Sequence, residues 1–339
     1  MEQYIKDLQD FTVLVRCFTF NHSAYITDAL NGFTIQQTNF PYVVVLVDDA
    51  STDGEQDIIK KYVKDNFSFS AYEIETDYAN ITFAQHRTNH NCYIAIYYLK
   101  ENHYSRKKKK APYVNPWREK CKYEAICEGD DYWVDSLKLQ KQVDILDGQI
   151  DVGLVHTAFD IVGKDSLLLK EEDIPPFYRT LEPNLSSGYI YDKLFNNSSS
   201  ILTCTIMYRI GKYETRIDHD LFMQVAKKYR IVYVDTITSC YRILPNSMMR
   251  SMYDSVASRL FDTISAHMLS FYSGDKEINE HYNISKMQNE VDMFFSKYIT
   301  YYLNWGRILK IPIKTIFNVL YKNPRLLIKT PFNIIKRLC

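Results

Sequence analysis

Short apolar runs alternate with segments of helical periodicity along the first quarter of the chain. Phe11–Phe18 and Tyr42–Val47 are β-rich runs. The second is continuous, as in a parallel strand that is buried on both faces. Between them, Ala24–Gln37 repeats apolar residues at helical spacing. A second helical segment follows, and then a strand-like run at Ala71–Thr76. This β-α-β-α-β alternation predicts a doubly wound nucleotide-binding sheet.

The α/β pattern continues to about residue 250 and then changes. We expect strands at Tyr123–Cys127, Val152–Val162, Ile201–Arg209 and Ile231–Asp235, and helices from Ser136 to Asp147 and at Asp218–Lys228. The polar stretches 78–118 and 164–197 indicate irregular connections. Beyond residue 250 the pattern is helical throughout. We therefore predict an α/β domain at 1–250, with a mixed sheet flanked by helices, and a helical C-terminal region at 251–339.

Charge is balanced over the chain but unevenly placed. Lys and Arg number 41, as do Asp and Glu, so the formal net charge is zero. Residues 299–339 nevertheless carry eight basic and no acidic side chains. A neutral body argues against a nucleic-acid binder, whereas the basic tail suggests a local anionic partner. In 307–339, proline breaks the mixed apolar and basic sequence into pieces too short to span a bilayer. We expect peripheral membrane contact there, or else packing of its apolar side on the protein.

Cysteine usage and the N-terminal residues bear on the compartment. The chain has seven Cys, an odd number, without CxxC or Cys/His ligand spacing. We expect buried free thiols in a reducing compartment. The sequence opens on Met-Glu-Gln-Tyr without the apolar segment of a secretory signal, and it has no run of 18 apolar residues. These features favour a cytoplasmic protein, with or without contact to the inner face of the membrane.

Three acidic turns carry the candidate chemistry. Asp48-Asp49 follows a strand, where ligands of open α/β sheets bind and a carboxylate can accept a hydrogen bond from a base or a ribose. Residues 128–131 (EGDD) also follow a strand, and three carboxylates in four residues suggest a hard divalent cation. Residues 218–220 (DHD) open a helix, where a carboxylate can act as a general base. Each turn alone also fits helix capping or simple solvation.

The motifs around these turns are informative as a set. They are Thr19-Phe20-Asn21-His22, residues 47–54 (VDDASTDG), residues 127–133 (CEGDDYW) and Tyr241-Arg242. Together they resemble the family-two glycosyltransferases of the GT-A fold, over roughly residues 10–250. The closest likeness is to the bacterial enzymes of capsule and surface-polysaccharide synthesis. Neither GxGxxG nor GxxxxGK occurs, which argues against dinucleotide and P-loop sites.

The resemblance implies a role for each matching position. Asp49 would contact the uracil ring of a UDP-sugar with Asp48 beside it, Thr19 and Phe20 would form the wall of the uridine pocket, Asp130 would bind Mn²⁺ or Mg²⁺, and Asp218 would be the catalytic base. Arg87 is a weaker candidate for a diphosphate contact. Glu128 replaces the usual Asp of the family's DxD motif and would reach ribose or a water on the metal.

Two further departures from the family pattern affect the site. Asp220 lies two residues from Asp218, and residues two apart on a helix point in different directions, so only one can face the donor. Leu244 stands where many relatives carry a His that helps at the metal or diphosphate. Asp130 and the diphosphate would then supply most of the non-water ligands of the metal.

The implied reaction moves a sugar, with inversion, from a nucleotide-sugar donor to a hydroxyl of a glycan or lipid-linked acceptor. Two alternatives stay open. A sugar-phosphate nucleotidyltransferase usually has a basic, Gly-rich loop after the first strand, and residues 19–25 are not one. A degenerate domain would bind sugar nucleotide or a partner without turnover. Arg106–Lys110 indicates a solvated loop or a contact to an anionic acceptor, and His219 a packing or surface role.

Overall fold

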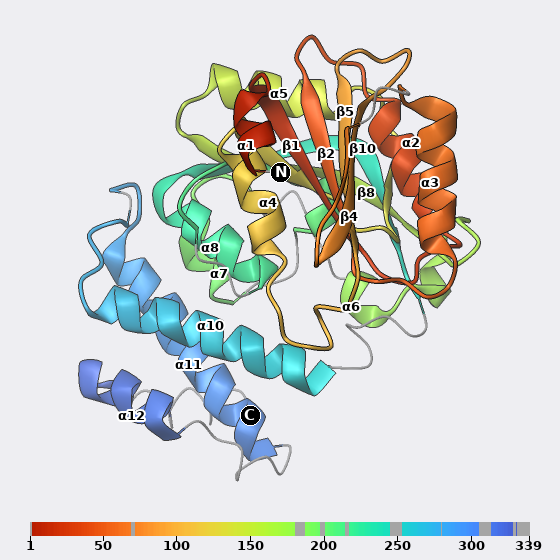
Figure 1. Cartoon of the computed structure of the whole chain (residues 1–339). Coiled ribbons are helices and arrows are strands. Elements are labelled where there is room, and N and C mark those ends of the chain that lie inside the picture. Colours follow the sequence, from red (N-terminus) through yellow and green to blue (C-terminus); the bar gives the residue numbers. More distant parts are fainter. Residues whose placement is uncertain are drawn as a thin grey trace. The chain divides into compact units, whose positions relative to one another are not determined.

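The chain forms two compact units. The computed structural model describes residues 2–68, 72–179, 187–196, 201–213, 217–244, 253–278, 280–304, 313–327 and 330 (Figure 1). Unit 1 comprises residues 1–185, 201–211 and 232–244. Unit 2 comprises residues 186–200, 212–231 and 245–339. Two segments that precede residue 250 therefore pack with the C-terminal helices.

Unit 1 is built on a ten-stranded mixed sheet of order β3-β4-β5-β2-β1-β6-β9-β8-β10-β7. The strands are β1 (Phe11–Thr19), β2 (Tyr42–Asp48), β3 (Tyr72–Glu75), β4 (Ala79–Gln85), β5 (Cys92–Leu99), β6 (Cys121–Ile126), β7 (Tyr132–Trp133), β8 (Val152–Val162), β9 (Met207–Arg209) and β10 (Arg230–Arg242). The four neighbours β5, β2, β1 and β6 run parallel. Their carboxyl ends consequently meet at one edge of the sheet.

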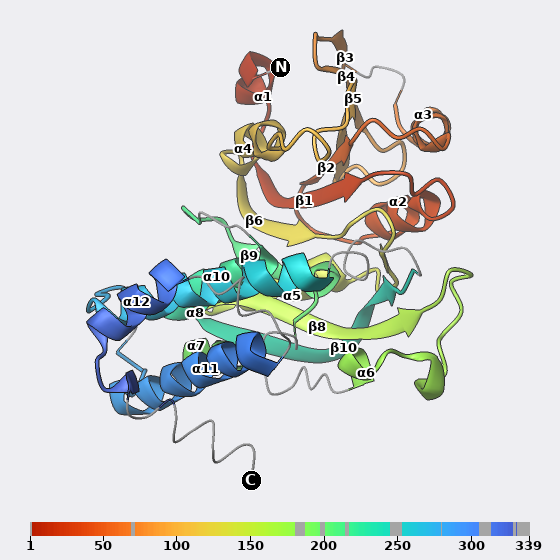
Figure 2. The same ribbon diagram turned by 90° about the horizontal axis from the view of Figure 1, so that it is seen from below.

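Helices cover both faces of the parallel strands (Figure 2). On one face lie α2 (Ile26–Thr34), α3 (Glu55–Asn66) and α5 (Lys138–Gly148), and on the other lie α1 (Glu2–Asp7) and α4 (Ala111–Arg118). The described part of unit 1 also contains the short helices η1 (Glu171–Asp173), α6 (Pro176–Arg179) and η3 (Thr203–Thr205). Every residue of β2 is buried, so its apolar run fills both cores. This is the burial that the continuous run predicts.

The mixed α/β architecture predicted from the pattern is confirmed. β8 and the helix at Asp218–Lys228 have the predicted bounds. A strand does form within Ala71–Thr76, as β3, but it does not continue the parallel alternation, because it pairs antiparallel with β4 at the edge of the sheet. The parallel neighbour of β2 is β5, within the stretch 78–118 that we expected to be irregular. The Ile201–Arg209 strand is also shorter than predicted: β9 begins at Met207.

Unit 2 is helical around its own core. It contains α7 (Tyr191–Leu194), α8 (Asp218–Lys228), α10 (Tyr253–Tyr272), α11 (Ile284–Asn304) and α12 (Ile313–Lys322). α10 packs against α8, α11 and α12. Met268, Met287 and Val291 are fully buried between these helices. Residues 305–312, 328–329 and 331–339 lie outside the described residues, so the prediction for 307–339 can be compared with structure only over 313–327 and at 330.

Two other expectations concern cysteines and membrane spans. The six cysteines within the described ranges are free, and five of them are buried. Burial raises the pKa of the Cys17, Cys127 and Cys204 thiols well above the usual value, so these thiols stay protonated. No helix in the part of the chain that the structure describes has the length and apolar character to cross a bilayer.

Candidate active site

The carboxyl edge of the parallel strands gathers most of the predicted site residues. Thr19 ends β1 directly beside Asp48, the last residue of β2. The Asp49 N–H donates to the Thr19 carbonyl at 3.0 Å, and the Gly129 N–H donates to the Phe18 carbonyl at 3.1 Å. These main-chain bonds join the ends of β1, β2 and the turn after β6. The structure therefore brings together, from distant parts of the sequence, the residues Thr19, Phe20, Asp48, Asp49, Glu128 and Asp130.

The two adjacent aspartates differ in their partners. Asp49 is 1% exposed, and its oxygens accept the main-chain N–H groups of His103 at 2.7 Å and Tyr104 at 3.1 Å. Asp48 accepts from Ser51 N–H and the Gln56 amide through Oδ1, while no donor among the described residues reaches its buried Oδ2. Burial raises the pKa of Asp48. Asp49 thus anchors a loop, whereas one buried oxygen of Asp48 has no donor among the described residues.

The loop held by Asp49, residues 102–110, contains the whole basic run Arg106–Lys110. Lys110 Nζ lies 3.0 Å from Asp49 Oδ2 and 5.0 Å from the centre of the Phe18 ring, with its side chain 19% exposed. Lys108 and Arg106 pair with Glu101. The prediction that this run is a solvated loop is therefore wrong for Lys110. Its ammonium group pairs with the buried carboxylate of Asp49 at the strand edge. A cation at this position can meet the phosphate of a bound nucleotide.

Glu128 is fixed against β1. Its Oε2 accepts the Phe18 N–H at 3.2 Å, and its Oε1 lies 3.8 Å from Arg16 Nη1. Arg16 also pairs with the fully buried Glu124 at 2.8 Å. Burial raises the pKa of Glu124, but hydrogen bonds from Arg118 and the charge of Arg16 outweigh it and hold that pKa below its ordinary value. The carboxylate of Glu128 thus contacts β1, and the Glu128 side chain is 35% exposed.

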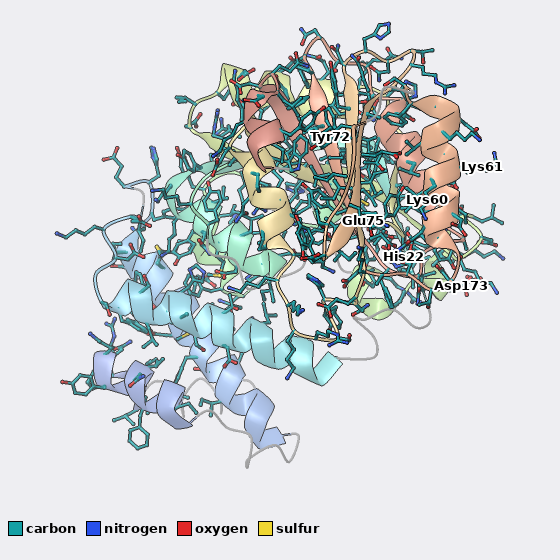
Figure 3. The ribbon with its side chains drawn as sticks, viewed as in Figure 1. His22, Lys60, Lys61, Tyr72, Glu75 and Asp173 are labelled. Atoms are coloured by element: carbon teal, nitrogen blue, oxygen red, sulfur yellow. The ribbon has the colours of Figure 1, made fainter. Side chains whose placement is uncertain are left out.

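A second set of hydrogen bonds connects the first turn to Asp130. The buried Glu55 carboxylate accepts from the Thr19 hydroxyl, from the His22 N–H at 2.9 Å and from the Ser51 hydroxyl at 2.8 Å. The Thr19 hydroxyl also lies 3.1 Å from Nδ1 of the His22 ring, whose Nε2 is 3.9 Å from Asp130 Oδ2. Figure 3 labels His22 near the start of α3. The ring of His22 therefore stands between Thr19 and Asp130.

Glycine is required at position 129 for this approach. A Cβ there would lie 2.6 Å from the Thr19 Cβ and 3.1 Å from His22 Nδ1. Both distances are too short for van der Waals contact, so any larger residue would push the acidic turn away from β1. The central Gly of the EGDD sequence is thus explained by close packing.

Buried side chains hold the acidic turn at residues 128–131 in place through hydrogen bonds. Asp131, 4% exposed, accepts the Arg242 main-chain N–H at 2.8 Å, and the Arg242 guanidinium donates to the Asp130 carbonyl at 2.8 Å and to Asp28 at 2.9 Å. Burial, and then the charge of Asp130, raise the pKa of Asp131 well above its ordinary range. Trp133 donates its indole N–H to the Cys204 carbonyl at 2.8 Å. The aromatic and basic residues of the motifs therefore hold the turn and leave Asp130 at the surface.

The predicted base lies in unit 2. Asp218 is exposed in the first turn of α8, whereas Asp220 is 6% exposed. Asp220 Oδ1 lies 2.9 Å from Nε2 of His267 on α10 and accepts from Gln224 at 3.0 Å. His219 is buried with Nε2 2.9 Å from the Leu194 carbonyl, which agrees with a packing role. Burial and these partners distinguish the two carboxylates that the sequence alone left open.

Arg87 is not brought to the carboxyl edge. It follows β4, which runs antiparallel to β5, so it lies beyond the opposite end of the parallel strands. Its guanidinium donates to the main-chain carbonyls of Phe67 at 2.7 Å, Asp65 at 3.1 Å and Lys64 at 2.8 Å. Arg87 closes the C-terminal end of α3, and we leave it out of the site.

Lys110, Glu55 and His22 are the site residues that sequence reasoning missed. Lys110 is one of five consecutive basic residues, and the sequence does not distinguish it from the others. Glu55 has the pattern of an ordinary acidic residue in the first turn of a helix. His22 stands in a motif that we quoted, but no spacing connects it with residue 130. In the residues that the structure describes, no three His, Cys, Asp or Glu side chains form a metal-binding group. The Asp130 carboxylate and the oxygens of a bound ligand are groups that Mg²⁺ and Mn²⁺ both accept.

An α/β domain with a carboxylate-lined strand edge is a common nucleotide-binding architecture. Comparison with known proteins shows which family part of the chain matches. Residues 17–97 match the model of "Glycosyl transferase family 2". The uncharacterized proteins Rv1520 of Mycobacterium tuberculosis and Mb1547 of Mycobacterium bovis are each 30% identical over 165 residues, which is 47% of this chain and 37% of each relative. The matched part thus spans well under half the length of these relatives.

Solved structures show the same fold. S. aureus TarS 1–349 in complex with UDP-GlcNAc aligns with a TM-score of 0.52 at 16% identity, covering 93% of this chain and 80% of that one. Its complex with UDP aligns with a TM-score of 0.51 at 16% identity, covering 96% and 88%. Residues 17–97 thus match a family-two glycosyltransferase model within a chain that shares the fold of these solved glycosyltransferase neighbours, in agreement with the resemblance of its motifs.

Proposed function

We propose that the protein transfers a sugar from a UDP-sugar to a hydroxyl of a glycan or lipid-linked acceptor, in a metal-dependent, inverting step of surface-polysaccharide synthesis such as that of capsule. The observation that carries the proposal is the convergence of Thr19, Asp48, Glu128 and Asp130 at one strand edge. Part of that edge lies in the segment that matches the family model. The UDP complex of TarS supports uridine as the first nucleotide to test.

The donor would be held by polar groups of unit 1. Asp48 Oδ2, which has no donor among the described residues, is the better placed acceptor for a uracil N–H, because both oxygens of Asp49 are already bonded. Phe20, 41% exposed beside Thr19, supplies a flat apolar surface for the base. Lys110 would face the diphosphate, and Asp49 would position Lys110.

Asp130 would hold Mn²⁺ or Mg²⁺. Its side chain is 23% exposed at the edge, which leaves room for ligand oxygens. When bound, a divalent cation offsets the charge that develops on the leaving diphosphate. Glu128, with its carboxylate held between Phe18 N–H and Arg16, would accept a hydrogen bond from ribose or from a water on the metal.

Asp218 would act as general base on the acceptor. It would take the proton of the acceptor hydroxyl as that oxygen forms a bond to the anomeric carbon, while the bond from this carbon to the diphosphate oxygen breaks and UDP leaves. Attack from the face opposite UDP inverts the anomeric centre, so an α-linked donor gives a β-linked product. Asp218 is exposed, as a residue that must meet an acceptor has to be.

Product release tests the proposal against its two alternatives. We expect the protein with Mn²⁺ and a panel of UDP-, GDP- and TDP-sugars to release the nucleoside diphosphate, fastest for a UDP-sugar, by slow hydrolysis in the absence of acceptor. Coupled detection of released UDP measures this. In a second assay, pyrophosphate release from UTP and a sugar 1-phosphate would instead indicate a nucleotidyltransferase. Saturable UDP-sugar binding without turnover in either assay would indicate a binding module.

We also propose that the C-terminal region meets the cytoplasmic leaflet, which suits a lipid-linked acceptor. One side of α12 and the segment after it pack inside unit 2, where Val319 and Leu326 are buried, so part of the apolar side belongs to the protein core. Another side leaves Phe317 70% and Tyr321 85% exposed, one turn apart on the helix. Lys322 and Arg325 are exposed in the same segment. Exposed aromatic rings next to cations match the headgroup region of an anionic membrane.

Vesicle binding tests this surface. We expect the wild type to co-sediment with vesicles containing anionic lipid, less so at high salt. Phe317→Ser together with Tyr321→Ser should weaken binding about tenfold or more, since one buried large apolar side chain is worth about 1.5–3 kcal/mol. Leu167→Ser with Leu168→Ser is the matched control, because these side chains are 65% and 66% exposed in unit 1. Equal binding by the Phe317/Tyr321 variant, or none by the wild type, would remove the membrane from the proposal.

A further inference from the structure

The position of His22 points to a second metal ligand. Nε2 of the ring lies 3.9 Å from Asp130 Oδ2, which is beyond hydrogen-bond distance. Its other nitrogen, Nδ1, lies 3.1 Å from the Thr19 hydroxyl. The ring is 21% exposed, and Gly129 leaves no space for a side chain between it and the acidic turn. The partner of Nδ1 decides whether Nδ1 or Nε2 carries the proton of the neutral ring.

The hydrogen bonds of the Thr19 hydroxyl place the proton of the neutral His22 ring on Nδ1. The Thr19 hydroxyl has one proton and gives it to Oε1 of Glu55. Glu55 is an acceptor here, since its other oxygen already accepts the His22 N–H and the Ser51 hydroxyl. Burial raises the pKa of Glu55, and the hydrogen bonds from Thr19, His22 and Ser51 offset this rise only in part. Because the Thr19 proton is committed, His22 Nδ1 must donate to the Thr19 oxygen. In the neutral ring, Nε2 then presents its lone pair on the side of Asp130.

A lone pair that faces a carboxylate without hydrogen bonding is suited to a cation. If a proton joined the two groups, Nε2 and Oδ2 would approach to about 2.7–2.9 Å, as charge-assisted hydrogen bonds do. Two atoms that share a metal at about 2.0–2.2 Å each can be separated by up to about 4 Å. The separation of 3.9 Å falls within this limit. Metal-binding histidines characteristically donate their other ring N–H to a polar partner, as His22 does to Thr19.

We propose that His22 Nε2 is a ligand, with Asp130, of the divalent cation and favours Mn²⁺ over Mg²⁺. The inference rests on the proposed metal dependence and names the residue that completes that site. Imidazole prefers transition ions, whereas Mg²⁺ prefers oxygen alone. Glu55 and Thr19 are positioning residues: they fix the tautomer and hold the ring in place. Their burial, at 0% and 3% exposure, makes that position rigid.

Pulsed EPR on bound Mn²⁺ tests the ligand directly. With UDP and Mn²⁺ added to the whole protein, we expect ¹⁴N modulation from a coordinated imidazole in the wild type. His22→Ala should remove the modulation and weaken Mn²⁺ binding about tenfold or more, with a smaller change for Mg²⁺. His90→Ala is the control, because His90 is an exposed histidine elsewhere in unit 1. Thr19→Val should weaken Mn²⁺ binding in the same direction, since losing a partner of a metal ligand typically costs about 10–100-fold.

The outcomes separate this inference from the proposed function. Bound Mn²⁺ without ¹⁴N modulation in the wild type, or equal Mn²⁺ affinity in His22→Ala, overturns the His22 assignment and leaves metal dependence intact. If the wild type with UDP binds no Mn²⁺, both fail. The wild-type spectrum decides the question even if a variant does not fold.

Discussion

Asp130→Ala is expected to abolish metal-dependent turnover while the protein stays folded. The metal is worth several kcal/mol of stabilisation to the leaving diphosphate, which corresponds to a loss of about a thousandfold in kcat. Folding should survive, because Arg242 bonds the main-chain carbonyl of Asp130 and this group remains in the variant. The charge of Asp130 also contributes to the raised pKa of the buried Asp131, so its removal relieves repulsion. Steady-state UDP release across a Mn²⁺ titration, with a thermal melt, measures both effects.

Asp57→Ala is the matched control for this experiment. Asp57 is 88% exposed on α3 of the same unit, and its contact with Lys60 is a surface pair at 3.8 Å. It should keep wild-type activity and melting temperature, as exposed pairs contribute little. Full activity of Asp130→Ala with unchanged dependence on added Mn²⁺ would overturn the metal assignment.

The architecture followed from the sequence where apolar runs were unambiguous. The run Tyr42–Val47 is buried along its whole length, and helix Asp218–Lys228 has its predicted ends. The pattern failed at β5, because its run is rich in Tyr and is preceded by a polar stretch, so local composition hid a strand that is decided by pairing with β2. Long-range pairing is a property of the whole sheet and leaves no local periodicity.

The site was predictable as far as strand ends allowed. Acidic turns after parallel strands must meet at one edge, and Asp48 and Asp130 do belong to one edge. The sequence did not predict that the Asp49 carboxylate is hydrogen bonded to the loop 102–110. Those bonds come from two main-chain N–H groups more than 50 residues away. The sequence also could not place Arg87, whose strand reverses direction, at the opposite end of the sheet. The direction of a strand and the burial of a side chain decide whether a residue can contribute to the site, and a sequence motif specifies neither.

Asp218→Asn is expected to lower kcat at least about a hundredfold with little change in donor binding, since a general base typically contributes about 10²–10⁴. The amide is the same size as the carboxylate but cannot take a proton at neutral pH. Asp218 is exposed, so the substitution should leave the melting temperature unchanged. Acceptor-dependent UDP release gives kcat, and UDP titration by calorimetry gives donor affinity.

Asp220→Asn supplies the comparison, because its carboxylate is buried and bonded to His267 and Gln224. We expect it to act on folding, lowering the free energy of unfolding by about 1–3 kcal/mol, the usual effect of weakening a buried charged hydrogen bond. Its kcat should fall far less than that of Asp218→Asn when both are assayed well below their melting temperatures. If Asp220→Asn loses a hundredfold in kcat at unchanged stability while Asp218→Asn stays active, Asp220 is the base, and its pairing with His267 serves catalysis.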